Sequence, residues 1–168
     1  DCRAGVERAV HTLGGLDILV NNAGVEEVRP ALEVDEALWD RILDTNLKGA
    51  FFCAQAFAAA MQAAGTGGAI INICSLTSYR GVPTAVPYTS SKSGLLGMTK
   101  ALAAEWAPLK IRVNGLAPGY FRTELTETFY RHQEWQEAML KKIPAGRFGC
   151  LDDLVGAAIF LASDASAY

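Results

Sequence analysis

The sequence predicts an α/β fold built on a doubly wound parallel sheet. Three short apolar runs, residues 16–20, 69–74 and 111–116, have the length and near-continuous hydrophobicity of buried parallel strands. Long helical patterns separate these runs, and strands that alternate with helices are typical of doubly wound sheets. The 168 residues are 51% hydrophobic and 20% charged, which is ordinary for a globular protein with a real core.

Apolar periodicity places the helices around the strands. Asp35 can cap one long helix, whose apolar residues recur as far as Met61. A second long helix carries Leu95, Leu102 and Trp106 on one stripe. The expected helices span residues 1–13, 35–61, 88–106, 126–142 and 152–162. Because no repeat, low-complexity segment or linker interrupts this order, residues 1–168 are predicted to form one domain.

Composition excludes several classes of function. The net charge is −3 and no basic cluster occurs, so neither nucleic acid nor an anionic membrane is an expected partner. No stretch resembles a signal peptide, and residues 50–64, the most apolar stretch, are too short to cross a bilayer. The four cysteines form no Cys-x-x-Cys pair: Cys2, Cys53, Cys74 and Cys150. We expect them to be reduced and buried in a cytoplasmic protein, without a metal site.

Tyr88 and Lys92 form a candidate catalytic pair. A spacing of four places them on one face of a helix, one turn apart. A free tyrosine has a pKa of about 10, and a nearby ammonium favours the phenolate. Lowering the pKa by about three units requires about 4 kcal/mol of differential interaction, which a close cation and the positive ring of a cofactor could supply together. Taken alone, the spacing also fits a surface helix with an aromatic residue in its first turn.

Other polar residues follow the strands or face inward. Ser75 ends the second strand, where its hydroxyl could bind a substrate carbonyl or simply form a turn. Asn46 lies on the inward stripe of its helix, where it could kink the helix and hold a water, or be satisfied by neighbouring backbone. Two loops offer small residues beside a ligand, namely Asn21-Asn22-Ala23-Gly24 and Pro118-Gly119 with Thr123 four residues later.

Together these residues resemble the short-chain dehydrogenase/reductase family. The matching elements are Asn21-Asn22-Ala23-Gly24, Asn46, Ser75, Tyr88-Thr-Ser-Ser-Lys92 and Pro118-Gly119-x-x-x-Thr123, in the family's order and spacing. The resemblance covers essentially the whole chain and implies a Rossmann-like sheet. The Gly-rich loop that receives a pyrophosphate in the family does not occur before Asn21, and the chain ends where a last strand would follow. We therefore expect the catalytic half of a domain truncated at both ends, a fragment that could itself be inactive.

The resemblance also implies roles for single residues. Tyr88 would be the general acid/base, Lys92 would lower its pKa and bind the nicotinamide ribose, and Ser75 would orient the substrate oxygen. Asn46 would hold a water that links Lys92 to solvent. Cofactor contacts would come from two loops and the catalytic pair: Asn21, Ala23, Gly24, Tyr88, Lys92, Pro118, Gly119, Phe121 and Thr123. The cofactor would be NAD or NADP, and the residue that selects between them lies outside this sequence.

The substrate is expected to be a sugar acid or a related polar molecule. Residues 126–142 take the place of the family's mobile substrate lid. The lid and its flanks bear a polar, partly cationic set: Arg80, Arg122, Phe129, Tyr130, Arg131, His132, Glu134 and Trp135. These charges suit a hydroxylated or carboxylated substrate, although they could equally be a solvated surface. Residues 117–126 and 143–149 look most similar to gluconate 5-dehydrogenases and 2-deoxygluconate 3-dehydrogenases.

Alternatives remain at this stage. 3-Oxoacyl-carrier-protein reductases share the same chemistry and are the next most similar group. A non-catalytic cofactor-binding or scaffold relative is another class, but such proteins typically lose the Tyr or Lys that this chain retains. Helices 35–61 and 88–106 present more apolar surface than one sheet face needs, so a homodimer or homotetramer through them is expected. The same surface could instead be covered within the chain.

Overall fold

A computed structural model, which describes residues 2–168, confirms the α/β fold. The strands β1 (Ile18–Asn21), β2 (Gly68–Ile73) and β3 (Ile111–Leu116) form one parallel sheet in the order β1-β2-β3. The register pairs Asn21 with Asn72 and Asn72 with Gly115, so the carboxyl ends of all three strands meet at one edge. Each expected strand is present within two residues of its expected bounds.

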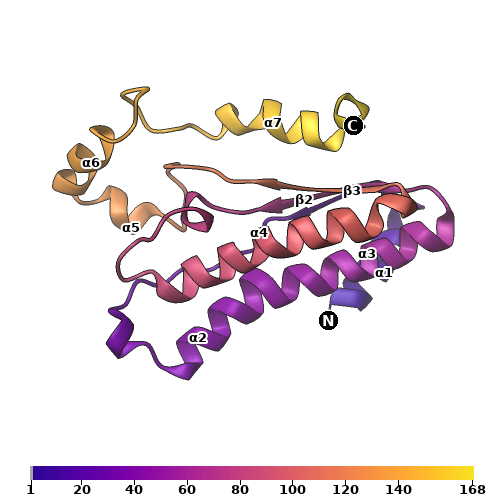
Figure 1. Ribbon diagram of the computed structural model, residues 1–168, viewed down its shortest axis with the longest axis horizontal. Coiled ribbons are helices and arrows are strands. Elements are labelled where there is room, and N and C mark those ends of the chain that lie inside the picture. The colour runs from indigo at the N-terminus through magenta and orange to yellow at the C-terminus, as the bar shows by residue number, and fades with distance from the viewer. Residues whose placement is uncertain (1) are drawn as a thin grey trace.

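Helices lie on both faces of the sheet. Figure 1 shows α3 and α4 on one face and α7 on the other, with α5 and α6 at one end of the molecule. The helices are α1 (Cys2–Leu13), α2 (Glu36–Leu43), α3 (Ala50–Ala64), α4 (Val86–Trp106), α5 (Glu127–Tyr130), α6 (Gln133–Leu140) and α7 (Asp152–Ala162). Short 3₁₀ turns span Ala31–Glu33, Leu76–Ser78, Ala107–Leu109 and Asp164–Ser166. This arrangement leaves the carboxyl edge of the sheet to the loops that carry the candidate site.

The main core lies between the sheet and the α3–α4 face. Phe57 from α3, Leu102 from α4, and Ile70, Ile111 and Val113 from the strands are all buried there. Complete burial of one such side chain contributes about 1.5–3 kcal/mol, so this layer supplies much of the stability that fixes the strand ends. The opposite face is thinner because α7 covers β2 and β3. Ile18 and Val20 on β1 are therefore 46% and 50% exposed, and the expectation of full burial is wrong for this strand.

The expected helix over residues 35–61 is interrupted in its middle. Asp35 caps α2 as predicted, since its carboxylate accepts the Leu38 N–H at 2.8 Å. Between α2 and α3, residues Asp44–Gly49 form a π-helical turn. Such turns insert an extra residue into a helix and often occur at functional sites. Asn46 lies within this π-helical turn, so the regular helix expected over residues 35–61 is interrupted there.

The region expected to be one helix over residues 126–142 is two short helices instead. His132 between α5 and α6 has an extended backbone, with φ −103° and ψ 108°. Aromatic packing favours this break, because the Trp135 ring stacks on both Phe129 and Phe148. Gln136 also donates from its amide to the Tyr130 carbonyl at 2.9 Å, which holds α6 against the end of α5. The two helices therefore fold as a small aromatic unit of their own.

Two further expectations concern the cysteines and the membrane. All four cysteines are free, and Cys74 is buried as expected. Cys53 and Cys2 are only partly buried and Cys150 is exposed, so the expectation of burial is wrong for these three. Among the described residues, no helix is long and apolar enough to cross a membrane.

Candidate active site

A buried polar chain joins the ends of β1 and β2 to the helices behind them. The Asn21 amide donates to the Asn72 side-chain oxygen at 2.8 Å and to the Ala50 carbonyl at 3.2 Å. Asn72 in turn donates to the Thr99 hydroxyl at 2.9 Å. Asn72 and Thr99 did not stand out in the sequence, because a strand Asn and a helix Thr have no spacing that marks them as partners. The predicted cofactor residue Asn21 therefore directs its side chain into this structural network.

The loop after β2 presents the Ser75 hydroxyl. Its oxygen accepts the Thr77 N–H at 3.1 Å, which makes Ser75 the cap of the following 3₁₀ turn. Ser78 donates to the Lys92 carbonyl at 2.8 Å and thereby ties this turn to α4. Leu76 N–H donates to the Pro118 carbonyl at 3.1 Å, which joins the turn to the loop after β3. The Ser75 hydroxyl is close enough to hydrogen-bond the Tyr88 oxygen, so its proton can be given to the phenol or to a substrate oxygen bound there.

Tyr88 and Lys92 lie beside this hydroxyl, one turn apart in the first half of α4. The Tyr88 ring packs on Leu38 and Ile42 of α2 and is 8% exposed. Lys92 is 4% exposed, and its ammonium donates to the Ile73 carbonyl at 2.7 Å. The ammonium nitrogen is 5.7 Å from the centre of the Tyr88 ring. Strand β2, its loop and α4 thus bring together the three residues predicted for catalysis.

The lowered pKa expected for Tyr88 depends on a bound cofactor, and the protein without one shifts the Tyr88 pKa in the opposite direction. Burial and the nearby Glu26 carboxylate raise the pKa of Tyr88 to about 12, although the Ser75 hydroxyl lowers it by hydrogen bonding. Burial also lowers the pKa of Lys92, so the ammonium is itself destabilised in this setting. Spacing alone could not reveal that burial is the largest influence on the Tyr88 pKa. The protein keeps Tyr88 a neutral proton donor unless further positive charge enters the site.

Asn46 links the π-helical turn to the loop that follows β1. The side chain is 1% exposed, and its oxygen accepts the Val25 N–H at 2.8 Å. Its amide donates to the Val25 carbonyl at 2.9 Å and to the Ser91 hydroxyl at 3.1 Å. Both amide protons are used and one oxygen lone pair remains. The main-chain partner of Asn46 is Val25, which is distant in the sequence and not a neighbour. A water that relays protons would have to bind the remaining lone pair or a main-chain carbonyl of the π turn.

Glu26 is a site residue that the sequence analysis missed. It follows Val25, and its carboxylate is close enough to Tyr88 and Lys92 to affect the pKa of both. Burial raises the pKa of Glu26, and the Lys92 ammonium partly offsets this effect. In the sequence, Glu26 stands beside another glutamate in a polar loop. Nothing but its place in the folded structure distinguishes it from a surface charge.

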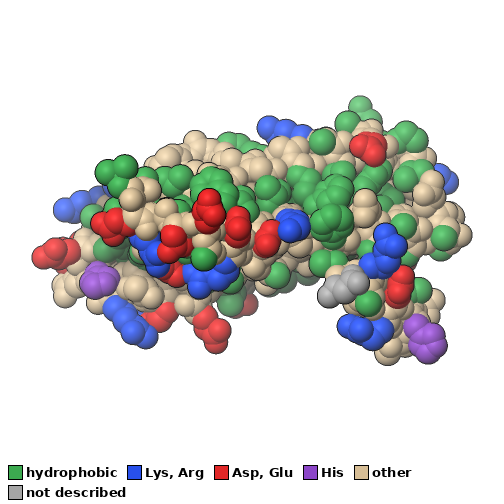
Figure 2. Space-filling view, turned by 90° about the horizontal axis from the view of Figure 1, so that it is seen from below, with side chains coloured by type: hydrophobic (Ala, Val, Ile, Leu, Met, Phe, Trp, Pro, Cys, Tyr) green, Lys and Arg blue, Asp and Glu red, His purple; other side chains and the backbone are tan. Residues whose placement is uncertain are grey.

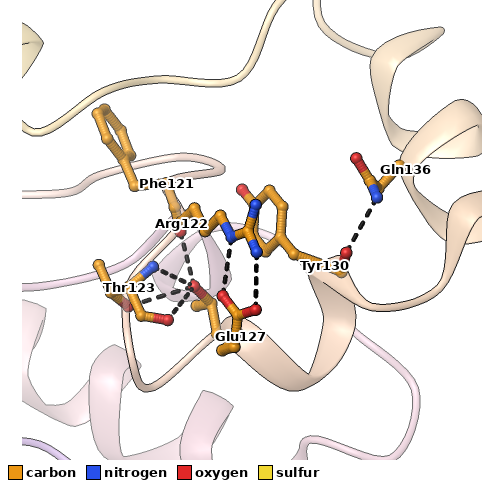
Figure 3. A network of polar contacts seen from close by, with 7 residues as sticks. Phe121, Arg122, Thr123, Glu127, Tyr130 and Gln136 are labelled. Atoms are coloured by element: carbon orange, nitrogen blue, oxygen red, sulfur yellow. Dashed lines mark hydrogen bonds and ion pairs between the residues drawn. The ribbon is translucent and has the colours of Figure 1, made fainter.

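The loop after β3 forms a separate hydrogen-bonded unit. Figure 3 shows Phe121 and Thr123 within this unit, and the Thr126 side chain organises it. Its hydroxyl donates to the Phe121 carbonyl at 2.7 Å and accepts the Thr123 N–H at 2.9 Å. Pro118 joins this loop to the Ser75 turn, while Gly119 has open space where a side chain would be. The structure thus groups Phe121 and Thr123 with the lid, and Pro118 and Gly119 with the catalytic loop.

The lid presents less free positive charge than its sequence suggested. Arg122 forms two hydrogen bonds of 2.8 Å to the Glu127 carboxylate, as Figure 3 shows. This pairing lowers the pKa of Glu127 and leaves the pair without net charge. The Arg122 guanidinium also lies 6.0 Å from the centre of the buried Tyr130 ring. Arg122 therefore serves the fold of the lid, and Arg80 and Arg131 remain as exposed cations of the predicted rim.

The donor set at the strand ends fits the sugar part of a nicotinamide cofactor. A Cβ at Gly24 would lie 3.5 Å from the Asn46 side-chain oxygen and 3.6 Å from the Lys92 ammonium, so the backbone here passes close to both groups. Lys92 has two ammonium protons beyond the one given to Ile73. Two such donors beside a phenol suit a vicinal diol. Ala23 is exposed, so small residues leave the approach open.

Comparisons with known proteins identify a matching family model and similar relatives. The family model described as enoyl-(acyl carrier protein) reductase matches residues 1–168. The chain is 45% identical over 163 residues to the 2-dehydro-3-deoxy-D-gluconate 5-dehydrogenase of Escherichia coli K12, covering 97% of this chain and 64% of that protein.

Two solved structures are also similar. One is a Sinorhizobium meliloti 1021 protein assigned to the short-chain alcohol dehydrogenases, with 63% identity and a TM-score of 0.96 over 99% of this chain and 66% of that chain. The other is a Burkholderia cenocepacia J2315 gluconate 5-dehydrogenase in complex with NADP and tartrate. It has 43% identity and a TM-score of 0.95 over 99% of this chain and 65% of that chain.

Proposed function

Because the chain belongs to the short-chain dehydrogenase/reductase family, we propose that the intact protein is an NAD(P)-dependent oxidoreductase acting on a secondary alcohol or ketone. The convergence of Ser75, Tyr88 and Lys92 at the ends of β2 and α4 carries this proposal. A protein that had kept only a scaffolding role would have no need of a buried phenol, ammonium and hydroxyl around one opening.

The site residues divide the proton chemistry among themselves. In ketone reduction, the Ser75 hydroxyl donates a hydrogen bond to the substrate oxygen, and Tyr88 transfers its phenolic proton to that oxygen as the carbonyl π bond breaks. When bound, a nicotinamide cofactor would supply the hydride for this chemistry. The raised pKa of Tyr88 suits its role as proton donor, because the phenol is fully protonated at neutral pH. In alcohol oxidation the same proton returns to Tyr88, which then requires positive charge nearby.

Lys92 and Gly24 are the residues that would hold the nicotinamide ribose. The Lys92 ammonium is fixed by Ile73 and directs its other protons toward the loop after β1. Pro118, Gly119, Phe121 and Thr123 would line the nicotinamide end, and Ala23 the adenosine side. Asn46 would support the water relay through its free lone pair or its π-turn backbone. NADP is the first cofactor to test, because the Burkholderia relative binds it, and NAD is the second.

The proposed substrate class is the sugar acids, with reaction at C5. Support comes from relatives named for 5-dehydrogenase activity on gluconate or a deoxygluconate derivative. The test is reduction of 5-keto-D-gluconate by the full-length enzyme with NADPH or NADH. The reaction is monitored by the loss of absorbance of the reduced nicotinamide. Turnover of acetoacetyl thioesters with none of sugar acids would instead favour the acyl-reductase alternative.

Self-association through the α3–α4 face is part of the same proposal. A mainly apolar groove between the π turn and α4 is lined by Leu43, Leu47, Phe51, Gly94 and Met98, together with the charged residues Asp44 and Lys48. A Cβ at Gly94 would lie 2.8 Å from a Leu47 methyl group, so Gly94 leaves room for the Leu47 side chain in this groove. Phe52 is 46% exposed, and Figure 2 shows hydrophobic side chains gathered across this side of the molecule. Light scattering of the full-length enzyme should report a dimer or tetramer.

A cytoplasmic location stays a prediction.

A further inference from the structure

Glu26 is a half-buried carboxylate without a partner in the structure. Within residues 2–168 it makes no hydrogen bond and no ion pair of 4.0 Å or less. The adjacent Glu27 provides the contrast, because it pairs with both Arg29 and Arg41 at the surface. Removing an ionised carboxylate from water costs free energy unless hydrogen bonds or an opposite charge compensate it. Such a group is usually protonated, paired with a cation or hydrogen-bonded to a ligand.

The loop that carries Glu26 is fixed on both sides. Before it, Val25 is clamped through its N–H and its carbonyl by the buried Asn46 amide. After it, Arg29 N–H donates to the Thr84 carbonyl at 2.7 Å, and residue 84 lies four positions before Tyr88. The Val25 side chain packs with the Tyr88 ring. These contacts hold the main chain of Glu26 beside the reacting phenol.

The groups that face Glu26 do not satisfy it. Lys92 is the cation that acts on it, yet one of that ammonium's protons is given to Ile73 and the two side chains form no direct pair. Tyr88 is affected by the negative charge but makes no hydrogen bond to it. Both groups belong to the proposed proton-transfer machinery. The acceptor capacity of Glu26 is thus unused, and the carboxylate is close to the two groups that would contact a substrate oxygen.

We propose that Glu26 is a specificity-determining residue whose carboxylate accepts a hydrogen bond from a substrate hydroxyl on a carbon next to the reacting carbon. This inference rests on the proposed function, since the reacting carbon is the one that faces Tyr88. An ionised carboxylate only accepts hydrogen bonds, so its partner must be a donor. In a C5 ketone of a sugar acid, the hydroxyls at C4 and C6 meet this requirement.

The proposal also orients the substrate. The carboxylate at C1 of a sugar acid would be repelled by Glu26, so it must lie away from this loop. The exposed cations Arg80 and Arg131 lie elsewhere on the rim predicted from the sequence. A methylene group or a thioester beside the carbonyl, as in an acetoacetyl thioester, would leave Glu26 unsatisfied. Sites built to bind a hydroxyl discriminate strongly against analogues that lack it, for this reason.

The test is a chemical double-mutant cycle on the full-length enzyme. Reduction of 5-keto-D-gluconate is compared with reduction of its 4-deoxy and 6-deoxy analogues, for the unmodified enzyme and for Glu26→Gln and Glu26→Leu. We expect removal of one of the two hydroxyls to lower kcat/KM of the unmodified enzyme about 10-fold to 100-fold. The same removal should cost Glu26→Leu less than about threefold, with Glu26→Gln between the two. A uniform effect of the substitution on Tyr88 cancels in this ratio.

Glu27→Gln is the matched control, because it makes the same chemical change one residue later on an outward-facing side chain. It should keep the discrimination of the unmodified enzyme. If Glu26→Gln and Glu26→Leu lose activity equally on the parent and both deoxy substrates, the role of Glu26 is overturned while the proposed function stands. If the unmodified enzyme fails to reduce 5-keto-D-gluconate at all, the proposed function and this proposal fall together.

Discussion

Replacing Asn46 by alanine should loosen the loop that carries the active-site residues 24–26. The side chain makes three hydrogen bonds, of 2.8 and 2.9 Å to the two main-chain groups of Val25 and of 3.1 Å to the Ser91 hydroxyl. Alanine removes all three at once and leaves a small void in a place that is 1% exposed. The loop after β1 would then lose its attachment to the π turn.

The magnitude follows from those contacts. A buried polar group that loses its partner costs about 1–3 kcal/mol. Val25 is only partly buried, so water can reach one of its two main-chain groups after the substitution. Ser91 keeps its own hydrogen bond to the Tyr88 carbonyl at 2.7 Å and contributes little to the loss. We therefore expect the free energy of unfolding to fall by about 2–4 kcal/mol.

Urea denaturation followed by circular dichroism measures this change. Asn114→Ala is the control, because Asn114 is a partly buried asparagine whose side chain makes no hydrogen bond in the described part of the chain. It should cost less than about 1 kcal/mol. A loss below about 1 kcal/mol for Asn46→Ala, or an equal loss for both variants, would refute the assignment of Asn46 as the clamp of this loop.

Three further predictions concern the site and the lid. Lys92→Met removes the buried ammonium, so cofactor affinity measured by fluorescence titration should fall at least about 10-fold, and unchanged affinity would contradict the ribose assignment. Gly149→Ala places a methyl group against the Phe121 ring and should destabilise the protein by about 1–3 kcal/mol. At Gly156 in α7 an added methyl group meets nothing within 4 Å, so Gly156→Ala should stabilise the protein by up to about 1 kcal/mol. Equal melting temperatures for Gly149→Ala and Gly156→Ala would refute this packing argument. Without cofactor, the Tyr88 pKa of about 12 predicts no phenolate absorbance from Tyr88 at pH of about 10, where a free tyrosine is half ionised. Because this folded-state pKa is raised, Tyr88 contributes stability below a pH of about 10, and this stability is lost as the pH rises toward 12. A difference titration against Tyr88→Phe with a midpoint near pH 10 would contradict the raised pKa.

Periodicity was enough to predict the fold because the strands are apolar and the helices have regular apolar stripes. All three strands and the two-faced helix arrangement were predictable in this way. The failures have local causes. The π turn at Asp44–Gly49 accompanies a tertiary contact between Asn46 and Val25. The apolar periodicity of the helix carries almost no sign of that contact. The break at His132 arises from ring packing around Trp135, which no spacing rule contains.

The candidate site was predictable as a set but not in its electrostatics. Ser75, Tyr88 and Lys92 follow strand ends and a helix turn, so their convergence could be expected from the doubly wound topology. Glu26 could not be found in this way, because one charge in a polar loop has no distinguishing pattern. The pKa of Tyr88 depends on how deeply α2 covers the ring, which sequence spacing does not specify.

The account depends most on Tyr88 as the proton donor and acceptor, and Tyr88→Phe in the full-length enzyme tests this directly. The variant removes one hydroxyl and keeps the ring packed on Leu38 and Ile42. We predict that kcat/KM for 5-keto-D-gluconate falls about 100-fold to 10,000-fold while cofactor affinity stays within about threefold. Retention of more than about a tenth of the activity, with an unchanged pH profile, would contradict the mechanism.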